Sequence, residues 1–357
     1  MTKRILVAPL DWGLGHATRC IPIIHALLAM GHEPIIATDG HAYDLLALEL
    51  PQLQILRLNG YHPFYPENGS MVIAMGRQLP KFIRAIAHER KIVEKWVKQY
   101  SIDGIISDNR YGAYSPLKPT AFITHQLNIR VPAWASLLNG PLARLNRLLI
   151  SPFNRVWIPD WPGDESLAGK LSEIEETNDR YQYIGPISRF GKIQKLPRQY
   201  DLLILLSGPE PQRSLLEKKI LSQLSSLNKK VLLVQGLISK KERKAFNDNL
   251  DVYSYMTTDE LVVALATSNL VVARSGYTTI MDMVAIGKQA LFIPTPGQTE
   301  QEYLAQELTR KEYFYSASQE KLNLSADLEI AEKYFPPDSI LKNEDPMHKA
   351  LEDWLRT

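Results

Sequence analysis

The segment RILVAPLDWGLGHATRCIPIIHALLAMGHEP (residues 4–34) decides the fold class. Ile5–Leu10 is an apolar run of strand length, and a glycine-rich turn follows it. Between Thr18 and Met30 apolar residues recur at helical spacing, and Gly31 is a stop signal before the next apolar run, 34–38. A strand, a helix and a second strand in this order predict a parallel sheet with helices on its faces.

The same alternation continues and then restarts. The first series extends through strands expected at 53–58, 104–107 and 120–124, with helices expected at 42–50 and 79–99. The second begins at DLLILLSG (201–208) and continues through KKVLLVQG, NLVVARSG and QALFIPTP. The sequence therefore predicts an α/β protein with a Rossmann-like domain at 1–185, a linker at 186–199 and a second Rossmann-like domain at 200–340. A C-terminal helix within 341–357 is a candidate to cross back to the first domain.

Composition sets wide bounds on function. A chain of 357 residues is long for one hydrophobic core, and its net charge of +2 does not indicate nucleic-acid binding. Cys20 is the only cysteine, which excludes an intrachain disulfide and suits a reducing cytoplasm. No apolar run approaches the ~20 residues of a membrane-spanning helix. We expect a cytoplasmic globular protein.

The first candidate site is the turn DWGLGH. Gly13 and Gly15 let backbone N–H groups face a ligand, and His16 stands where a helix begins. The positive end of a helix dipole favours neutral imidazole, which can accept a proton as a general base. The alternative is that His16 only caps or packs. The third glycine of a dinucleotide-binding motif is missing, although Asp39 stands near the position of its acidic residue, so an NAD enzyme stays a remote alternative.

The second candidate site lies in ARSGYTTIMDMVAIGKQALFIPTPGQTEQ (273–301). A strand runs into an arginine, a serine and a glycine, and a helix with two N-terminal threonines follows. Free N–H groups at a helix start, with hydroxyls and an arginine, suit a diphosphate. Asp282 is placed to accept hydrogen bonds from a ribose diol, unless it is only a solvated helix residue. The predicted donor-binding residues of this segment are Arg274, Ser275, Gly276, Thr278, Thr279, Asp282, Gln298 and Gln301.

This segment resembles GT-B glycosyltransferases of family 28, the type that includes MurG and plant galactolipid synthases. The family pattern, roughly R-S-G-x-x-T-x-x-E and then Q-x-x-N-A, is matched here by 274–282 and 301–305, with Asp282 for the glutamate and Leu304 for the asparagine. The resemblance implies two Rossmann-like domains facing a central cleft. It also implies diphosphate contacts at Ser207 and Gly208, and base contacts at Tyr255 and Met256, whose alternative is a strand end packed in the core.

Acceptor residues are expected in the first domain. Asp108 with Arg110, and His125 with Gln126, follow two predicted strands and join Gly13 and Gly15 as candidate acceptor contacts. Residues 109–159 contain six Lys or Arg and no Asp or Glu, and the basic apolar segment 130–159 within them suits a membrane face or a lipid-linked acceptor. A buried helix with arginines at its rim explains the same pattern equally well.

The function implied by the resemblance is transfer of a hexosyl or N-acetylhexosaminyl group from a nucleotide sugar, most simply a UDP-sugar, with inversion. No D-x-D motif and no metal-ligand spacing occur, so we expect no metal and no cofactor. His16 would deprotonate the acceptor hydroxyl. A UDP-sugar hydrolase of the same fold is one alternative, and a non-catalytic protein that binds a nucleotide sugar or a lipid is another.

Overall fold

The computed structural model describes residues 1–61, 71–174, 178–191, 193–194, 196–238, 242–336 and 345–356. The chain forms two compact units. Unit 1 comprises Met1–Ile187 and Glu344–Thr357, and unit 2 comprises Ser188–Asn343. Most of the predicted linker, from Ser188 onward, thus belongs to unit 2. The predicted boundary between residues 340 and 341 lies outside the described residues.

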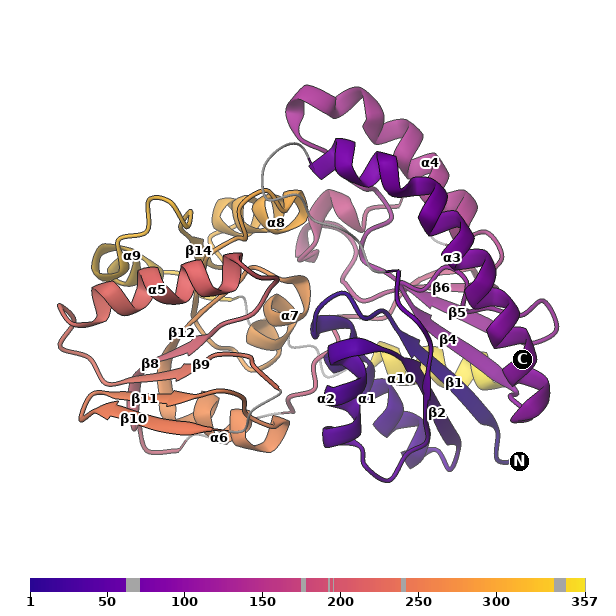
Figure 1. Cartoon of the computed structure of the whole chain (residues 1–357), viewed down its shortest axis with the longest axis horizontal. Helices are drawn as coiled ribbons and strands as arrows, with labels where there is room; N and C mark the ends of the chain where they lie inside the picture. The colour runs from indigo at the N-terminus through magenta and orange to yellow at the C-terminus, as the bar shows by residue number, and fades with distance from the viewer. Residues whose placement is uncertain are drawn as a thin grey trace. The chain divides into compact units, whose positions relative to one another are not determined.

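Unit 1 is built on a parallel sheet of seven strands in the order β3-β2-β1-β4-β5-β6-β7 (Figure 1). The strand order changes direction between β1 and β4, and in open α/β sheets such a switch point binds ligands at the carboxyl ends of the strands. The strands are β1 (Arg4–Pro9), β2 (Glu33–Thr38), β3 (Ile55–Arg57), β4 (Gly104–Asp108), β5 (Thr120–Ile123), β6 (Arg155–Ile158) and β7 (Tyr181–Tyr183).

Helices cover both faces of this sheet because its central strands are apolar on both sides. Leu6 and Ala8 of β1 pack with Val93 and Val97 of α3. On the other face a Cβ at Gly104 would lie 2.6 Å from the Trp354 ring, so the last helix, α10, packs against the sheet there. The helices are α1 (Gly15–Ala29), α2 (Gly40–Glu49), α3 (Met71–Gln99), η1 (Ala133–Leu138), α4 (Asn139–Ile150), η2 (Gly163–Glu165), η3 (Gly169–Leu171) and α10 (Pro346–Leu355).

Unit 2 repeats the doubly wound plan on a second sheet of seven strands, in the order β10-β11-β9-β8-β12-β13-β14. Only the edge pair β10–β11 is antiparallel. The strands are β8 (Tyr200–Leu205), β9 (Val231–Val234), β10 (Arg243–Asn247), β11 (Leu250–Tyr253), β12 (Ser268–Ala273), β13 (Ala290–Phe292) and β14 (Tyr315–Ser316). The helices are α5 (Gln212–Leu224), α6 (Thr258–Thr267), α7 (Tyr277–Ala285), α8 (Thr299–Arg310) and α9 (Leu324–Ala331).

The predicted elements differ from these mainly at their ends. Helix α1 begins at Gly15 rather than Thr18, because the N–H of Thr18 already donates to the Leu14 carbonyl at 2.9 Å. His16 is therefore in the first turn of the helix. Strands β6, β7, β10 and β14 and helix α9 were not predicted from the sequence. The sequence RKAFN of β10 is mostly polar, as an edge strand allows.

Candidate functional site

The first site forms at the switch point of unit 1, where β1 and β4 end side by side. Pro9 is the register partner of Asp108, and the N–H of Leu10 donates to the Asp108 carbonyl at 2.9 Å. Gly13, with φ +77°, turns the chain from β1 into α1. The turn therefore brings the first residues of α1 over the end of β4.

His16 and Asp108 meet at this point. Nδ1 of His16 lies 2.9 Å from Oδ1 of Asp108, and the imidazole keeps 17% of its side-chain surface exposed while the carboxylate is fully buried. Nη2 of Arg19 also lies 3.0 Å from Nδ1. An ionised carboxylate accepts a hydrogen bond from Nδ1–H, and in that tautomer Nε2 keeps a lone pair that can take a proton. This is the orientation that a general base needs, and Asp108 is positioned to act through His16.

Arg19 completes the group from the next turn of α1. Its Nε donates to Oδ2 of Asp108 at 2.8 Å, and its Nη2 donates to Oδ1 of the same carboxylate. Burial raises the pKa of Asp108, but the charges of Arg19 and His16 and their hydrogen bonds outweigh it and hold the pKa well below its usual range. Asp108 is therefore ionised at neutral pH, as its role beside His16 requires. The sequence analysis did not select Arg19, although three residues after His16 is the spacing that puts both on one face of a helix.

The remaining acceptor candidates lie in different surroundings. His125 is buried, with Nδ1 3.4 Å from Nη1 of Arg19, so it borders the same group. Gln126 is half-buried, and its backbone carbonyl accepts from the Asn146 side chain at 2.8 Å. Gly15 is the first residue of α1.

Arg110 requires a correction. Its guanidinium is fully buried, and Nε donates to Oε1 of Glu89 at 2.9 Å. Nη2 donates to the carbonyls of Leu58 and Asn59 at 2.8 and 2.6 Å. These contacts join α3 to the end of β3, so the guanidinium does not contact an acceptor itself but holds Glu89 and residues 58–59 in place. The prediction failed because a residue one position after a strand-end aspartate can point into the protein as well as out of it.

The second site lies at the carboxyl ends of β8, β12 and β13 in unit 2. Ser207 and Gly208 are exposed in the loop before α5, and Gly208 has φ +103°. Gly276 is the N-cap of α7, and Thr278 and Thr279 are half-buried in its first turn. The Ser275 hydroxyl donates to the Gln301 carbonyl at 2.9 Å, which ties the α7 loop to α8. Two helix N-termini with their N–H groups thus follow neighbouring strands, as a diphosphate site requires.

Arg274 also requires a correction. Its side chain is buried and donates from Nη1 to the carbonyls of Ile293 and Pro294, at 3.2 and 3.1 Å, and from Nη2 to the carbonyl of Gln212 at 2.8 Å. Burial lowers the pKa of Arg274 to about 10. The Nη atoms of the arginine therefore join the loops after β12 and β13 to the start of α5, while Nε is buried and has no hydrogen-bond partner among the described residues.

Asp282 is buried, with 6% of its surface exposed, and Oδ1 accepts from the Ser188 hydroxyl at 2.6 Å. Burial raises its pKa to about 6, although the charge of Arg189 and the hydrogen bond from Ser188 lower it. The interpretation of Asp282 as a solvated helix residue is therefore wrong. Sequence reasoning missed Ser188, because a contact across 94 residues leaves no local signal.

The remaining donor candidates border the same loops. Tyr255 and Met256 are buried at the end of the segment after β11. Gln298 is the N-cap of α8, and Oε1 of Gln301 accepts from the N–H of Thr295 at 2.9 Å. Thr295 was not predicted. Its buried hydroxyl has no hydrogen-bond partner among the described residues, and it lies 3.7 Å from the position that a Cβ on Gly208 would take.

No group of three or more His, Cys, Asp or Glu side chains suitable for a metal occurs in the described part of the chain. In the same part, none of the helices is both long and apolar enough to cross a bilayer.

Comparison with known proteins identifies the fold and the type of enzyme. The model of the glycosyltransferase family 28 C-terminal domain matches residues 211–344. An uncharacterized glycosyltransferase of Methanosarcina mazei is 24% identical over 322 residues, which cover 84% of this chain and 81% of the relative.

The UDP-N-acetylglucosamine--N-acetylmuramyl-(pentapeptide) pyrophosphoryl-undecaprenol N-acetylglucosamine transferase of Glaesserella parasuis is 22% identical, over 97% of this chain and 90% of its own.

Solved structures agree on the architecture. The glycosyltransferase SnogD from Streptomyces nogalater superposes with a TM-score of 0.65 at 13% identity, over 100% of both chains. MurG of Acinetobacter baumannii gives a TM-score of 0.56 at 12% identity, over 99% of this chain and 100% of its own. The predicted fold class, with two Rossmann-like domains of GT-B type, is confirmed. The chain has the GT-B fold, its second unit contains the C-terminal domain of glycosyltransferase family 28, and over most of its length the chain is similar to glycosyltransferases of the family 28 type.

Proposed function

We propose that this enzyme transfers a hexosyl or N-acetylhexosaminyl group from a UDP-sugar to a hydroxyl of the acceptor, with inversion and without a metal. The observation that carries the proposal is the 2.9 Å contact between Nδ1 of His16 and Asp108, which leaves Nε2 as a proton acceptor. Nε2 takes the proton of the acceptor hydroxyl while the hydroxyl oxygen forms a bond to the anomeric carbon of the donor. The bond from that carbon to the diphosphate oxygen breaks, and UDP leaves with the electron pair. One displacement inverts the anomeric centre.

Unit 2 would bind the donor. The N–H groups at the start of α7 suit the diphosphate, and the exposed backbone of Ser207 and Gly208 allows close approach, although at the start of α5 the N–H groups of Arg213 and Ser214 already donate to Pro209 and Glu210. Asp282 would accept hydrogen bonds from the ribose in place of the one it now accepts from Ser188. Charge that develops on the leaving diphosphate would be stabilised by the N-terminal end of α7. The contacts of Arg274 favour an indirect role for it, as a residue that fixes the two loops.

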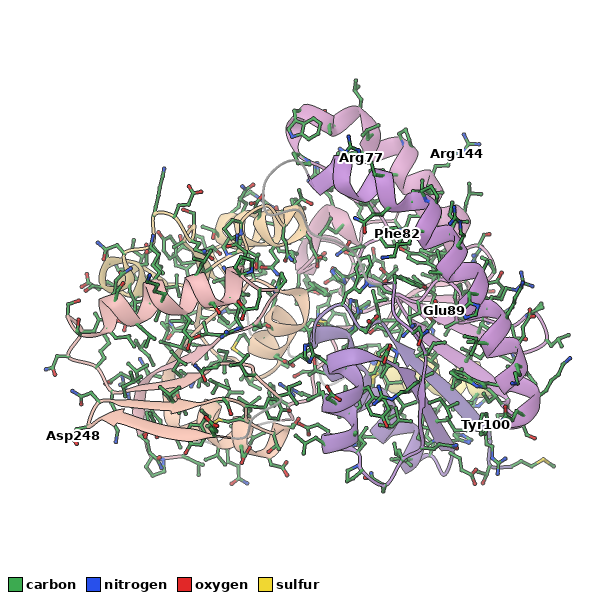
Figure 2. The ribbon with its side chains drawn as sticks, viewed as in Figure 1. Arg77, Phe82, Glu89, Tyr100, Arg144 and Asp248 are labelled. Carbon is green, nitrogen blue, oxygen red and sulfur yellow. The ribbon has the colours of Figure 1, made fainter. Side chains whose placement is uncertain are left out.

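A lipid-linked acceptor fits the surface of unit 1. On η1 and α4, Trp134 is 66% exposed and Leu137 is 93% exposed, and Leu148 is exposed as well. Arg144 and Arg147 are exposed on α4, and Figure 2 labels Arg144. Apolar side chains beside arginines suit peripheral contact with an anionic bilayer. The Glaesserella parasuis relative is named for a pyrophosphoryl-undecaprenol substrate. We place this enzyme at the cytoplasmic face of a membrane.

The test combines binding with turnover. Purified protein is titrated with UDP, GDP, dTDP and NAD in a calorimeter, and is then incubated with UDP-sugars, with and without lipid-linked acceptors, while UDP release is measured. We expect UDP to bind best and His16→Ala to retain UDP affinity but lose 10²–10⁴-fold in rate, the usual contribution of a general base. His25→Ala is the matched control, because His25 is exposed on the same helix.

Each other outcome contradicts a specific part of the proposal. UDP release that needs no acceptor would identify a hydrolase. A preference for NAD would refute the assignment of unit 2 to a UDP-sugar. Full activity in His16→Ala would remove the general base from the mechanism.

A further inference from the structure

Three aromatic rings meet beside the glycine turn of unit 1. Trp12 lies in that turn, Tyr61 follows β3, and Phe82 projects from α3 (Figure 2). The Trp12 ring centroid lies 6.2 Å from that of Tyr61 and 5.9 Å from that of Phe82. Trp12 and Phe82 are only partly buried. The rings of Trp12 and Phe82 therefore form a partly accessible apolar surface. Trp12 stands four positions before His16, the proposed base.

Buried polar atoms gather in the same place. Oδ1 of Asp11 and Nε1 of Trp12 are buried and have no hydrogen-bond partner among the described residues, whereas the buried Tyr61 hydroxyl and Glu89 interact with each other. Glu89 is 2% exposed, and its Oε1 is also paired with Arg110. A buried polar atom without a partner costs about 1–3 kcal/mol. Two of them, on the neighbouring residues Asp11 and Trp12, indicate a site for polar ligand groups.

The region is rich in carboxylates. Burial raises the pKa of Glu89, and the charge of Asp11 raises it further. Burial and the charge of Glu89 raise the pKa of Tyr61 well above its usual value. Arg110 is the cation paired with Glu89, and its remaining hydrogen bonds go to backbone carbonyls. An anionic ligand would be repelled here, whereas a ligand with hydroxyl donors would be bound.

A pocket of about 210 Å³ opens beside Glu89 (Figure 2 labels this residue), between 58–60 and the α3 residues Ala85, His88, Glu89 and Ile92. We call it the Glu89 pocket. At ~30 Å³ for each water molecule, the pocket has room for about seven waters. This is more space than one or two waters bridging the buried polar atoms would fill. Asp11 borders it closely, since a Cβ on Gly60 would lie only 1.9 Å from Oδ2 of Asp11.

We propose that the Glu89 pocket, with the rings of Trp12 and Phe82, binds an uncharged pyranose ring of the acceptor. Sugar hydroxyls would donate to Glu89 and Asp11, and Nε1 of Trp12 would donate to a sugar oxygen. The apolar face of the ring would pack on the aromatic side chains. As an acceptor subsite this inference rests on the proposed transferase function, but binding of the sugar itself can be measured without turnover.

The experiment is saturation-transfer NMR on the full chain, titrated with methyl glucoside, with methyl N-acetylglucosaminide and with methyl glucuronide, and with UDP in every tube. We expect at least one neutral glycoside to bind at least tenfold more tightly than the glucuronide. Asp11→Asn and Trp12→Phe should each weaken that glycoside at least tenfold and leave UDP unchanged. Trp96→Phe, a change at a partly buried tryptophan that does not line the pocket, is the matched control and should leave both ligands unchanged.

Two variants are used because either one alone could fail to fold, which thermal unfolding would reveal. Binding of UDP without any glycoside, equal binding of neutral and acidic glycosides, or full glycoside binding in the folded variants would overturn the inference. Glycoside binding that both variants lose, in a protein that does not bind UDP, would support the pocket and refute the proposed donor.

Discussion

Replacing Asp282 with asparagine should change how stability depends on pH. Burial raises the pKa of Asp282 from 3.8 to about 6 in the folded protein, so folding favours its protonated form. At 1.36 kcal/mol for each pKa unit, this increase in pKa contributes about 3 kcal/mol to the free energy of unfolding when Asp282 is protonated. Solvent screens the carboxyl little, because only 6% of the residue is exposed. The stabilisation by the protonated form is complete below about pH 4 and is lost as the pH rises through about 6.

Relative to the wild type, Asp282→Asn should therefore gain up to about 3 kcal/mol in the free energy of unfolding between pH 4 and pH 7. The amide keeps an oxygen to accept from Ser188, so the hydrogen bond at 2.6 Å can persist. Subtracting the wild-type pH profile from that of the variant removes the titration of every other group. Asp259→Asn, which removes an exposed carboxylate from α6 in the same unit, is the matched control.

The assay can separate the two units. All six tryptophans, at positions 12, 96, 134, 157, 161 and 354, belong to unit 1, so tryptophan fluorescence follows that unit alone. Circular dichroism in urea reports both units. The change should appear in the dichroism transition and not in fluorescence. A variant that is less stable than the wild type by the same amount at every pH would refute the reasoning, because Arg189 would then hold Asp282 ionised throughout.

Three further predictions concern unit 1. Arg110→Met should lower the free energy of unfolding by about 3–5 kcal/mol, because it leaves Glu89 buried without its cation. In urea unfolding followed by tryptophan fluorescence, a loss under about 1 kcal/mol would contradict this. Gly13→Ala should lower the free energy of unfolding by about 1 kcal/mol, because φ at this position is +77°, although no atom lies within 4 Å of the new Cβ. Gly140→Ala, in equally open space but without a positive φ, should not lower the melting temperature. Leu137→Glu should reduce sedimentation with anionic vesicles at least tenfold, and Leu117→Glu, at another exposed leucine, should not; equal binding by both would argue against a membrane surface on η1 and α4.

The sequence predicted the features that follow from strand ends. Parallel sheets place ligand residues at their carboxyl edge, so His16 and Asp108 could be selected from their positions after apolar runs. The direction of a side chain does not follow from that rule. Arg110 and Arg274 also stand at strand ends, but both turn inward to backbone carbonyls.

Contacts between residues far apart in the sequence could not be predicted either. Ser188 reaches Asp282 across 94 residues, and Trp12 meets Phe82 on a helix that begins 59 positions later, at Met71. The spacing of residues within one segment does not indicate which distant residues they contact. The residues of the Glu89 pocket were missed for this reason, although Asp11 and Trp12 stand inside the motif that the sequence analysis examined first.

The return of α10 to unit 1 also constrains how the protein forms during translation. Trp354 packs against the Trp157 ring at 5.7 Å, and Lys3 donates to the carbonyl of Leu355, so the first and last segments of the chain complete one unit. The ribosome makes residues 1–187 before unit 2, yet it makes the helix that covers Gly104 after unit 2. At 5–20 residues per second the wait is roughly 10–30 s. During this time the nascent first unit exposes an apolar sheet face, a binding site for chaperones, while unit 2 can fold entirely from its own continuous segment.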